Sequence, residues 1–250
     1  MPASFWDIVN KVIDKSDIIL EVLDARMPNE TRNREVEDKT KRQGKALIYV
    51  INKSDLITKE NAEKLKSNLN HSVFVSSTKH HGTTILLKEI LKIANIKFPD
   101  KEKISVGVLG YPNVGKSSVI NALKGRSSAP SSSKSGYTKH EQLIKVTSKI
   151  YLIDTPGVFP FMEKDEIKHV LTASADPARI KDPESAAMII IKQLKGKVEE
   201  FYGVDKNEDV EEALEQIAIA KRKLKKGNLP DTKTMSRIII EDWQKGKISA

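Results

Sequence analysis

Cysteine is absent from all 250 residues of this sequence, which excludes disulfide bonds, thiolate metal sites and cysteine nucleophiles. Long apolar runs are also absent, because the stretch at residues 188–191 is far too short to span a bilayer. The first residues, MPASFWDIVNK, lack the basic start and apolar stretch of a signal peptide. We therefore expect a soluble, cytoplasmic protein with no membrane partner.

The composition is that of a globular protein, with 38% hydrophobic, 31% charged and 5% aromatic residues. The length suits either one large domain or an ordinary domain with a small second one. The formal net charge is +9, and residues 1–160 hold 26 basic against 17 acidic side chains, whereas residues 161–250 hold 17 of each. This excess fits attraction to a polyanion such as RNA, and it equally fits a lysine-rich solvated surface.

Apolar runs of strand length alternate with helical patterns over the first 160 residues. Strands are expected at residues 16–25, 45–52, 72–75 and 104–110 and in the runs QLIKVT and KIYLID, and helices at residues 31–43, 58–69 and 83–94. This alternation predicts an α/β fold, an open and mostly parallel sheet with helices on both faces.

After about residue 160 only helical patterns remain, at residues 182–196, 207–224 and 232–247. The first of these has Asp182 as its N-cap, a proline in its first turn and a glycine at its end. We expect a domain of residues 1–162 and a small all-helical C-terminal domain of residues 163–250. The polar, serine-rich patch at residues 126–136 is too polar to order itself.

The run GYPNVGKSS, residues 110–118, follows a predicted strand and leads into a predicted helix. Glycines allow successive backbone N–H groups to turn inward and cradle phosphates at a helix N-terminus. Lys116 would then reach the β and γ phosphates, and the Ser117 hydroxyl would bind Mg²⁺. The alternative is a glycine loop beside an incidental lysine. The candidate phosphate-binding residues are Asn113, Val114, Gly115, Lys116, Ser117 and Ser118.

Two later segments supply groups that sense a γ-phosphate. The run KIYLIDTPG would bring Asp154 to the carboxyl edge of the sheet, where it can hold a water on Mg²⁺, and Gly157 would offer its N–H to the γ-phosphate. The segment SGYTKH contains Thr138, and a loop that orders when Thr138 meets Mg²⁺ and γ-phosphate is a switch. We therefore expect Ser117, Thr138 and Asp154 around Mg²⁺.

The early run VINKSDL ends another predicted strand and contains Asn52, Lys53 and Asp55. A carboxylate there can accept two hydrogen bonds from the Watson–Crick edge of guanine, which adenine does not offer. The Lys53 stem would cover the base, and Asn52 would tie loops together. After the next strand, VSSTKHHG offers Ser76, Ser77 and Thr78, with the Ser77 N–H facing guanine O6. On its own this last segment is equally a simple polar turn.

All five elements of a G protein are thus present, but in the order four, five, one, two, three (G4-G5-G1-G2-G3). A consistent cyclic order of five signals leaves little room for coincidence. The sequence therefore predicts a circularly permuted P-loop G domain that binds GTP or GDP with Mg²⁺, followed by the helical domain.

The sequence resembles the circularly permuted GTPases of the YlqF/RbgA and YawG class, which are linked to large ribosomal subunit assembly. The matching text is DARMP at residues 24–28 with the following TRN, then INKSD, GYPNVGKSS, SGYT and DTPGV, and YGV and IIIEDWQKGKIS in the tail. The resemblance implies a monomeric GTPase that acts as a switch on the large ribosomal subunit or its precursor, contacting rRNA and ribosomal protein through the C-terminal domain. Two alternatives are a GTPase of another RNA process, such as tRNA modification, and a nucleotide-gated RNA-binding module that does not hydrolyse.

The resemblance also bears on catalysis. Val158 stands where many G proteins carry glutamine, so intrinsic hydrolysis should be slow and stimulated by K⁺ or the ribosome. In relatives an asparagine matching Asn113 coordinates K⁺ in place of an arginine finger; the alternative is that Asn113 only shapes its loop. Several bacterial relatives use an N-terminal histidine, a role that is not transferable here because no histidine precedes His71. The expected catalytic residues are Asn113, Lys116, Thr138 and Gly157.

Overall fold

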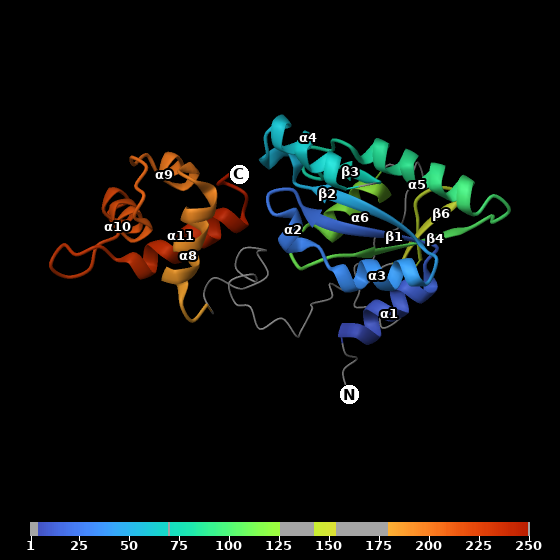
Figure 1. Ribbon diagram of the computed structural model, residues 1–250, viewed down its shortest axis with the longest axis horizontal. Coiled ribbons are helices and arrows are strands. Elements are labelled where there is room, and N and C mark those ends of the chain that lie inside the picture. The colour runs from blue at the N-terminus through green and yellow to red at the C-terminus, as the bar shows by residue number, and fades with distance from the viewer. Residues whose placement is uncertain (1–4, 70, 126–142, 154–179, 250) are drawn as a thin grey trace. The chain divides into compact units, whose positions relative to one another are not determined.

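The structure of the protein is a computed structural model that describes residues 5–69, 71–125, 143–153 and 180–249 (Figure 1). The chain forms two compact units, residues 1–162 and 163–250. In the described ranges, no helix is both long and apolar enough to cross a membrane.

The first unit is built on a six-stranded sheet with the order β3-β2-β1-β4-β6-β5. Its strands are β1 (Ile18–Asp24), β2 (Ala46–Asn52), β3 (Ser72–Phe74), β4 (Ile104–Leu109), β5 (Leu143–Lys145) and β6 (Ile150–Ile153). Only the β5–β6 pairing is antiparallel among these strands. The predicted α/β fold with a mostly parallel sheet is confirmed.

Helices cover both faces of this sheet, as predicted (Figure 1). Helices α1 (Phe5–Lys15) and α3 (Arg34–Arg42) pack on one face, and α5 (Thr83–Lys97) and α6 (Lys116–Lys124) on the other. The other described helical segments of this unit are α2 (Pro28–Thr31), the 3-10 turn η1 (Ser54–Leu56) and α4 (Lys59–Asn68). Successive side chains of a strand point to opposite faces. Ile19 therefore packs with Val12 of α1 and Val36 of α3, whereas Leu20 packs in the core that α5 and α6 cover.

Two details of the first unit differ from the sequence prediction. Helix α1 was not expected, although Val9, Val12 and Ile13 have helical spacing and are buried. The charged segment expected as one helix from residue 31 instead begins at Arg34, because the Asn33 side chain caps it by accepting the backbone N–H groups of the second and third helical residues.

In its described residues, 180–249, the second unit is helical, as predicted, with α8 (Pro183–Leu194), α9 (Lys197–Tyr202), α10 (Val210–Ala220) and α11 (Thr232–Gln244). Asp182, Asp209 and Asp231 cap three of them by accepting backbone N–H groups of the first turn. Their apolar faces meet in one buried core that includes Ile190, Ile217, Ile239 and Trp243. Helix α9 was not foreseen from the sequence.

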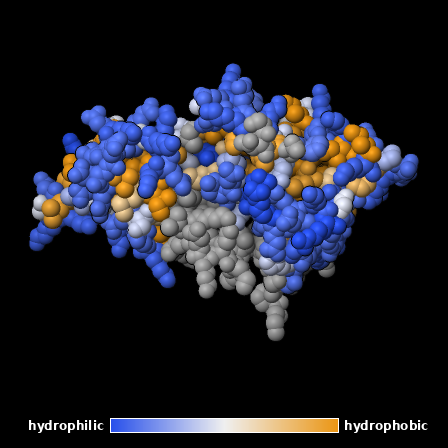
Figure 2. Space-filling model, viewed as in Figure 1, coloured by the Kyte–Doolittle hydropathy of each residue, from blue (hydrophilic) through white to orange (hydrophobic). Residues whose placement is uncertain are grey.

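Between α10 and α11 the chain makes a short turn-back, residues 221–230, which we call the basic hairpin. Lys225 N–H donates to the Leu229 carbonyl oxygen at 2.8 Å, and Leu224 bridges to Pro230. The hairpin carries Lys221, Arg222, Lys223, Lys225 and Lys226 and no acidic residue. Leu229, which pairs with Lys225 beside the turn, is 63% exposed. Figure 2 shows that hydrophilic residues predominate on the visible face of each unit.

Candidate functional site

The loop between β4 and α6 has the backbone of a phosphate-binding loop. Helix α6 begins at Lys116 with Gly115 as its N-cap, at a φ of 95° that side chains rarely tolerate. A Cβ on Gly115 would overlap the side-chain nitrogen of Asn52, and one on Gly110 would overlap the Val22 carbonyl oxygen. The loop therefore lies directly against its neighbours and leaves the amides at the start of α6 for an anion.

The Lys116 side chain turns back over this loop. Its ammonium donates to the carbonyl oxygens of Gly110 at 2.7 Å and Tyr111 at 2.5 Å. Burial lowers the pKa of Lys116 to about 8. An anionic ligand beside this ammonium would favour its charged form further, so phosphate binding and the positive charge of Lys116 would stabilise each other.

The other predicted residues of the loop are arranged for access from solvent. Asn113, Ser117 and Ser118 are exposed, whereas Val114 is buried and offers its carbonyl oxygen inward. Within the described ranges no cluster of three or more acidic or histidine side chains could hold a metal alone. Mg²⁺ commonly binds through one or two protein oxygens, waters and substrate phosphates, so the exposed Ser117 hydroxyl fits such a site.

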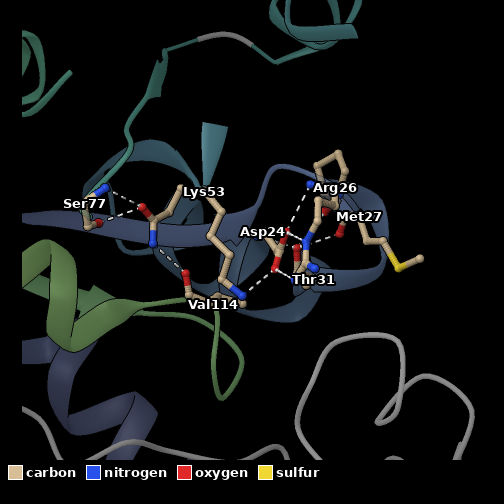
Figure 3. Close-up of polar contacts among 9 residues, drawn as sticks. Asp24, Arg26, Met27, Thr31, Lys53, Ser77 and Val114 are labelled. Carbon is tan, nitrogen blue, oxygen red and sulfur yellow. Dashed lines mark hydrogen bonds and ion pairs between the residues drawn. The ribbon is translucent and has the colours of Figure 1, made fainter. Parts of the chain in front are cut away.

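Asn52 joins the guanine-side loops to the phosphate loop. Its amide nitrogen donates to the Val114 carbonyl oxygen at 2.8 Å, and its amide oxygen accepts from Ser77 Oγ at 2.7 Å and from Ser77 N at 3.3 Å (Figure 3). The side chain is only 2% exposed. A single amide therefore joins the end of β2 to the loops that follow β3 and β4, and Asn52 and Val114 lie 62 residues apart in sequence.

The Asp55 carboxylate lies in η1, just beyond this junction. Its Oδ1 accepts from Ser76 Oγ at 2.6 Å, and its Oδ2 lies 3.7 Å from the Lys79 ammonium. Ser76 Oγ also lies 3.5 Å from Thr78 Oγ1. The predicted residues Ser76, Ser77 and Thr78 thus gather around Asn52 and Asp55, and the carboxylate keeps further acceptor capacity for a ligand.

The loop that follows β3 and helix α6 line an open pocket of about 560 Å³, whose lining does not include Asn52, Lys53, Asp55 or Lys116. Its lining residues are Ser77, Thr78, His80, Ser118, Asn121, Ala122 and Gly125. The volume is typical of small-molecule sites. Asn121, Ala122 and Gly125 were not foreseen as site residues; their spacing of three, four and seven residues from Ser118 places them on one side of α6 and is the signal that could have found them.

A second group beside the site was not predicted. Asp24, at the end of β1, accepts from Arg26 Nε at 3.0 Å and from Arg26 Nη2 at 2.8 Å, and its Oδ2 lies 2.7 Å from the Lys53 ammonium (Figure 3). Burial alone would raise the pKa of Asp24. The hydrogen bond and positive charge of Arg26, together with the charge of Lys53, outweigh this effect and lower the pKa of Asp24 to about 2. The guanine-motif lysine is therefore anchored by a residue of the DARMP run.

Four predicted positions, Thr138, Asp154, Gly157 and Val158, lie outside the described residues. Their roles toward Mg²⁺, the γ-phosphate and the attacking water stay predictions.

Family models match both parts of the chain. The model described as "RsgA GTPase" matches residues 8–162, and the model described as "50S ribosome-binding GTPase" matches residues 105–227.

Individual relatives agree with these matches. A GTP-binding protein of Methanocaldococcus jannaschii is 42% identical over 97% of this chain, and nucleolar GTP-binding protein 2 of Yarrowia lipolytica is 34% identical over 97%. The chain spans 65% and 49% of the lengths of these two relatives. The crystal structure of GNP-bound YlqF from T. maritima has a similar fold, with a TM-score of 0.66, 22% identity, and coverage of 96% of this chain and 93% of that one.

Proposed function

Because this chain belongs to the RsgA GTPase family, we propose that it binds GTP and GDP in the pocket between the guanine-side loops and α6 and hydrolyses GTP to GDP and phosphate. The observation that carries this proposal is the Asn52 side chain, which holds Val114 of the phosphate loop and Ser77 of the guanine-side loop in one buried junction. Base recognition and phosphate binding are thereby built into a single site.

The chain's own groups supply part of the charge stabilisation that phosphoryl transfer needs. The Lys116 ammonium exchanges its two loop carbonyls for phosphate oxygens, and the amides at the start of α6 bind the phosphates. Mg²⁺ at the Ser117 hydroxyl would neutralise further charge on the β and γ phosphates. The Asp55 carboxylate accepts the paired N–H groups of guanine.

Hydrolysis by the isolated chain is proposed to be slow, because Val158 has no polar group to orient the attacking water. Asn113, an exposed residue of the phosphate loop at a φ of 57°, is the proposed K⁺ ligand. Single-turnover GTP hydrolysis in K⁺ and in Na⁺, with and without large ribosomal subunits, tests this. A rate that neither K⁺ nor subunits raise would instead favour a binding module that does not hydrolyse.

The base site is tested by the selectivity of the Asp55→Asn variant. Its amide matches the hydrogen-bonding edge of xanthine better than that of guanine, so preference should shift from GDP toward xanthosine diphosphate. The Glu60→Gln variant is a suitable control, because Glu60 is exposed and pairs with Lys64 on α4. An unchanged preference for GDP in the Asp55 variant would refute the base-site role.

The proposed biological setting is assembly of the large ribosomal subunit, with rRNA as the partner of the helical unit. The supporting feature is the basic hairpin, which displays five cations without an acidic residue. Phosphate neutralisation by such cations gives salt-dependent binding. The matched region of the "50S ribosome-binding GTPase" model, which extends to residue 227, is consistent with this setting.

Co-sedimentation with large subunits in the presence of a non-hydrolysable GTP analogue tests the partner. Replacing Lys223, Lys225 and Lys226 of the basic hairpin by glutamine should weaken co-sedimentation and reduce its salt dependence. A matched control replaces three other exposed lysines of the same unit, Lys192, Lys195 and Lys233. Binding to free tRNA but not to subunits would favour the alternative role in tRNA modification.

A further inference from the structure

The DARMP run contains a residue that contributes to base recognition, although it belongs neither to the nucleotide-binding motifs nor to the lining of the pocket. We propose that Asp24 is a positioning residue: its carboxylate anchors the Lys53 ammonium and thereby holds the Lys53 stem in place over the guanine ring. This inference rests on the proposed function, since it concerns the same nucleotide site. It assigns Asp24 no contact with the nucleotide itself.

The backbone brings the two residues together. Strands β1 and β2 pair in parallel with Asp24 directly opposite Asn52, and Ala25 N–H donates to the Asn52 carbonyl oxygen at 2.8 Å. Lys53 follows in the left-handed conformation, at a φ of 60°. This turn sends its side chain across the end of the sheet to Asp24, as Figure 3 shows, instead of outward from β2.

The carboxylate itself is rigid. Arg26 donates to it through its backbone N–H at 3.0 Å and through two guanidinium nitrogens, and the Asp24 backbone N–H donates to Thr31 Oγ1 at 3.1 Å. Both the Arg26 and Asp24 side chains are buried. Planar two-point contacts of this kind fix orientation as well as distance, so Lys53 is held by an immobile partner.

One carboxylate balances two cations in this cluster. Burial lowers the pKa of Lys53 and the positive charge of Arg26 lowers it further, whereas Asp24 acts in the opposite direction. Without the Asp24 charge, Lys53 would face a buried guanidinium, and of the favourable charges only the weaker effect of Asp55 would remain. Its long side chain would then leave the cluster and regain rotamer freedom, and ordering it on the base would weaken nucleotide binding.

The Asp24→Asn variant tests this by its effects on three ligands. We expect GDP and inosine diphosphate to lose affinity by the same factor, roughly three- to tenfold for one side chain that must be ordered again. Their affinity ratio should persist because Asp55 is untouched, and the affinity for pyrophosphate should persist because the phosphate loop is untouched. Competition against a fluorescent GDP measures all three.

Asp17→Asn is the matched control. Asp17 immediately precedes β1, at the opposite end of the strand from Asp24, and also pairs with a lysine, Lys101, at 2.6 Å. It should leave affinity for every ligand unchanged. The proposal would be overturned if the Asp24→Asn and Asp17→Asn variants bound GDP with equal affinity. It would also be overturned if Asp24→Asn lowered the affinity for pyrophosphate by the same factor as the affinity for GDP.

Lys53→Met removes the anchored charge and keeps an apolar stem, which tests the link even if Asp24→Asn folds poorly. This variant should lose GDP affinity by a similar factor, and adding Asp24→Asn to it should cause no further loss. Additive losses would show that Asp24 acts without Lys53 and would refute the inference. A wild-type chain that binds ADP as tightly as GDP would instead overturn the proposed function itself.

Discussion

Glu21 is the clearest source of pH-dependent stability in the first unit. It lies in the middle of β1 and is 1% exposed. Its Oε1 accepts the Asn33 backbone N–H at 2.7 Å, while Oε2 has no hydrogen-bond partner within the described part of the chain. Burial, with a smaller effect of the negative Glu37, raises its pKa to about 8.

The sign of the effect follows from this raised pKa. A glutamate with an ordinary pKa of 4.5 in the unfolded chain loses its proton there first, so the folded state holds the extra proton between pH 4.5 and 8. The free energy of unfolding should therefore fall as pH rises through this range and level off above it. At about 1.4 kcal/mol per pH unit, the fall from pH 5 to 8 is on the order of 4 kcal/mol.

Glu21→Gln removes the titrating carboxyl group, so the difference in the free energy of unfolding between the variant and wild type should show its contribution. Urea unfolding at pH 5, 6, 7 and 8 would measure both proteins, and the stability of the variant relative to wild type should rise with pH by roughly that amount. Asp17→Asn is the control, because hydrogen bonds from Lys101 and Ser105 and the charge of Lys101 lower the pKa of Asp17 despite its burial. Its difference from wild type should be flat over this range. A flat difference for Glu21→Gln would refute the reasoning.

Three further substitutions test the packing of the two units. Gly115→Ala should abolish GDP binding measured by calorimetry, since the added Cβ would overlap the Asn52 side chain. Gly44→Ala is the control and should leave GDP binding unchanged, because a Cβ there meets open space at a similar positive φ. Asn52→Ala should lower the free energy of unfolding by about 2 to 4 kcal/mol in urea, because it leaves a buried carbonyl and two Ser77 donors unpaired. Tyr202→Phe removes the hydrogen bond to Asp242 Oδ2 at 2.8 Å, and should cost the helical unit about 1.5 to 3 kcal/mol in thermal unfolding; no loss would mean that water replaces the hydroxyl.

The sequence predicted most of this architecture because its periodic signals are strong. Buried parallel strands read as continuous apolar runs, and β1, β2 and β4 lie where such runs occur. Asp182 correctly marked the start of α8, because capping is a local hydrogen bond. Helix α1 was missed, since its apolar residues are interrupted by charged and polar ones.

The site was predicted less completely, for a different reason. Asn52, Asp55 and Lys116 follow from motifs whose spacing encodes their chemistry. The Asp24–Lys53 pair depends on the register of β1 against β2, and the contact of Lys116 with two loop carbonyls depends on a rotamer. Neither a strand register nor a rotamer can be predicted from local sequence, so only the fold shows that Asp24 anchors Lys53.

The permuted strand order has a consequence for how the chain folds as it is synthesised. Strands β1, β2 and β3 pair in succession, so this half of the sheet has its internal partners within the first 74 residues. Later, β4 joins the free edge of β1, and β6 and β5 extend the sheet from there. Short loop closures are favoured, and chains fold from the N-terminal side during translation. Strands β1, β2 and β3, which carry the guanine-side loops, can therefore pair first and offer the free edge of β1 to β4 and the phosphate loop that follows it.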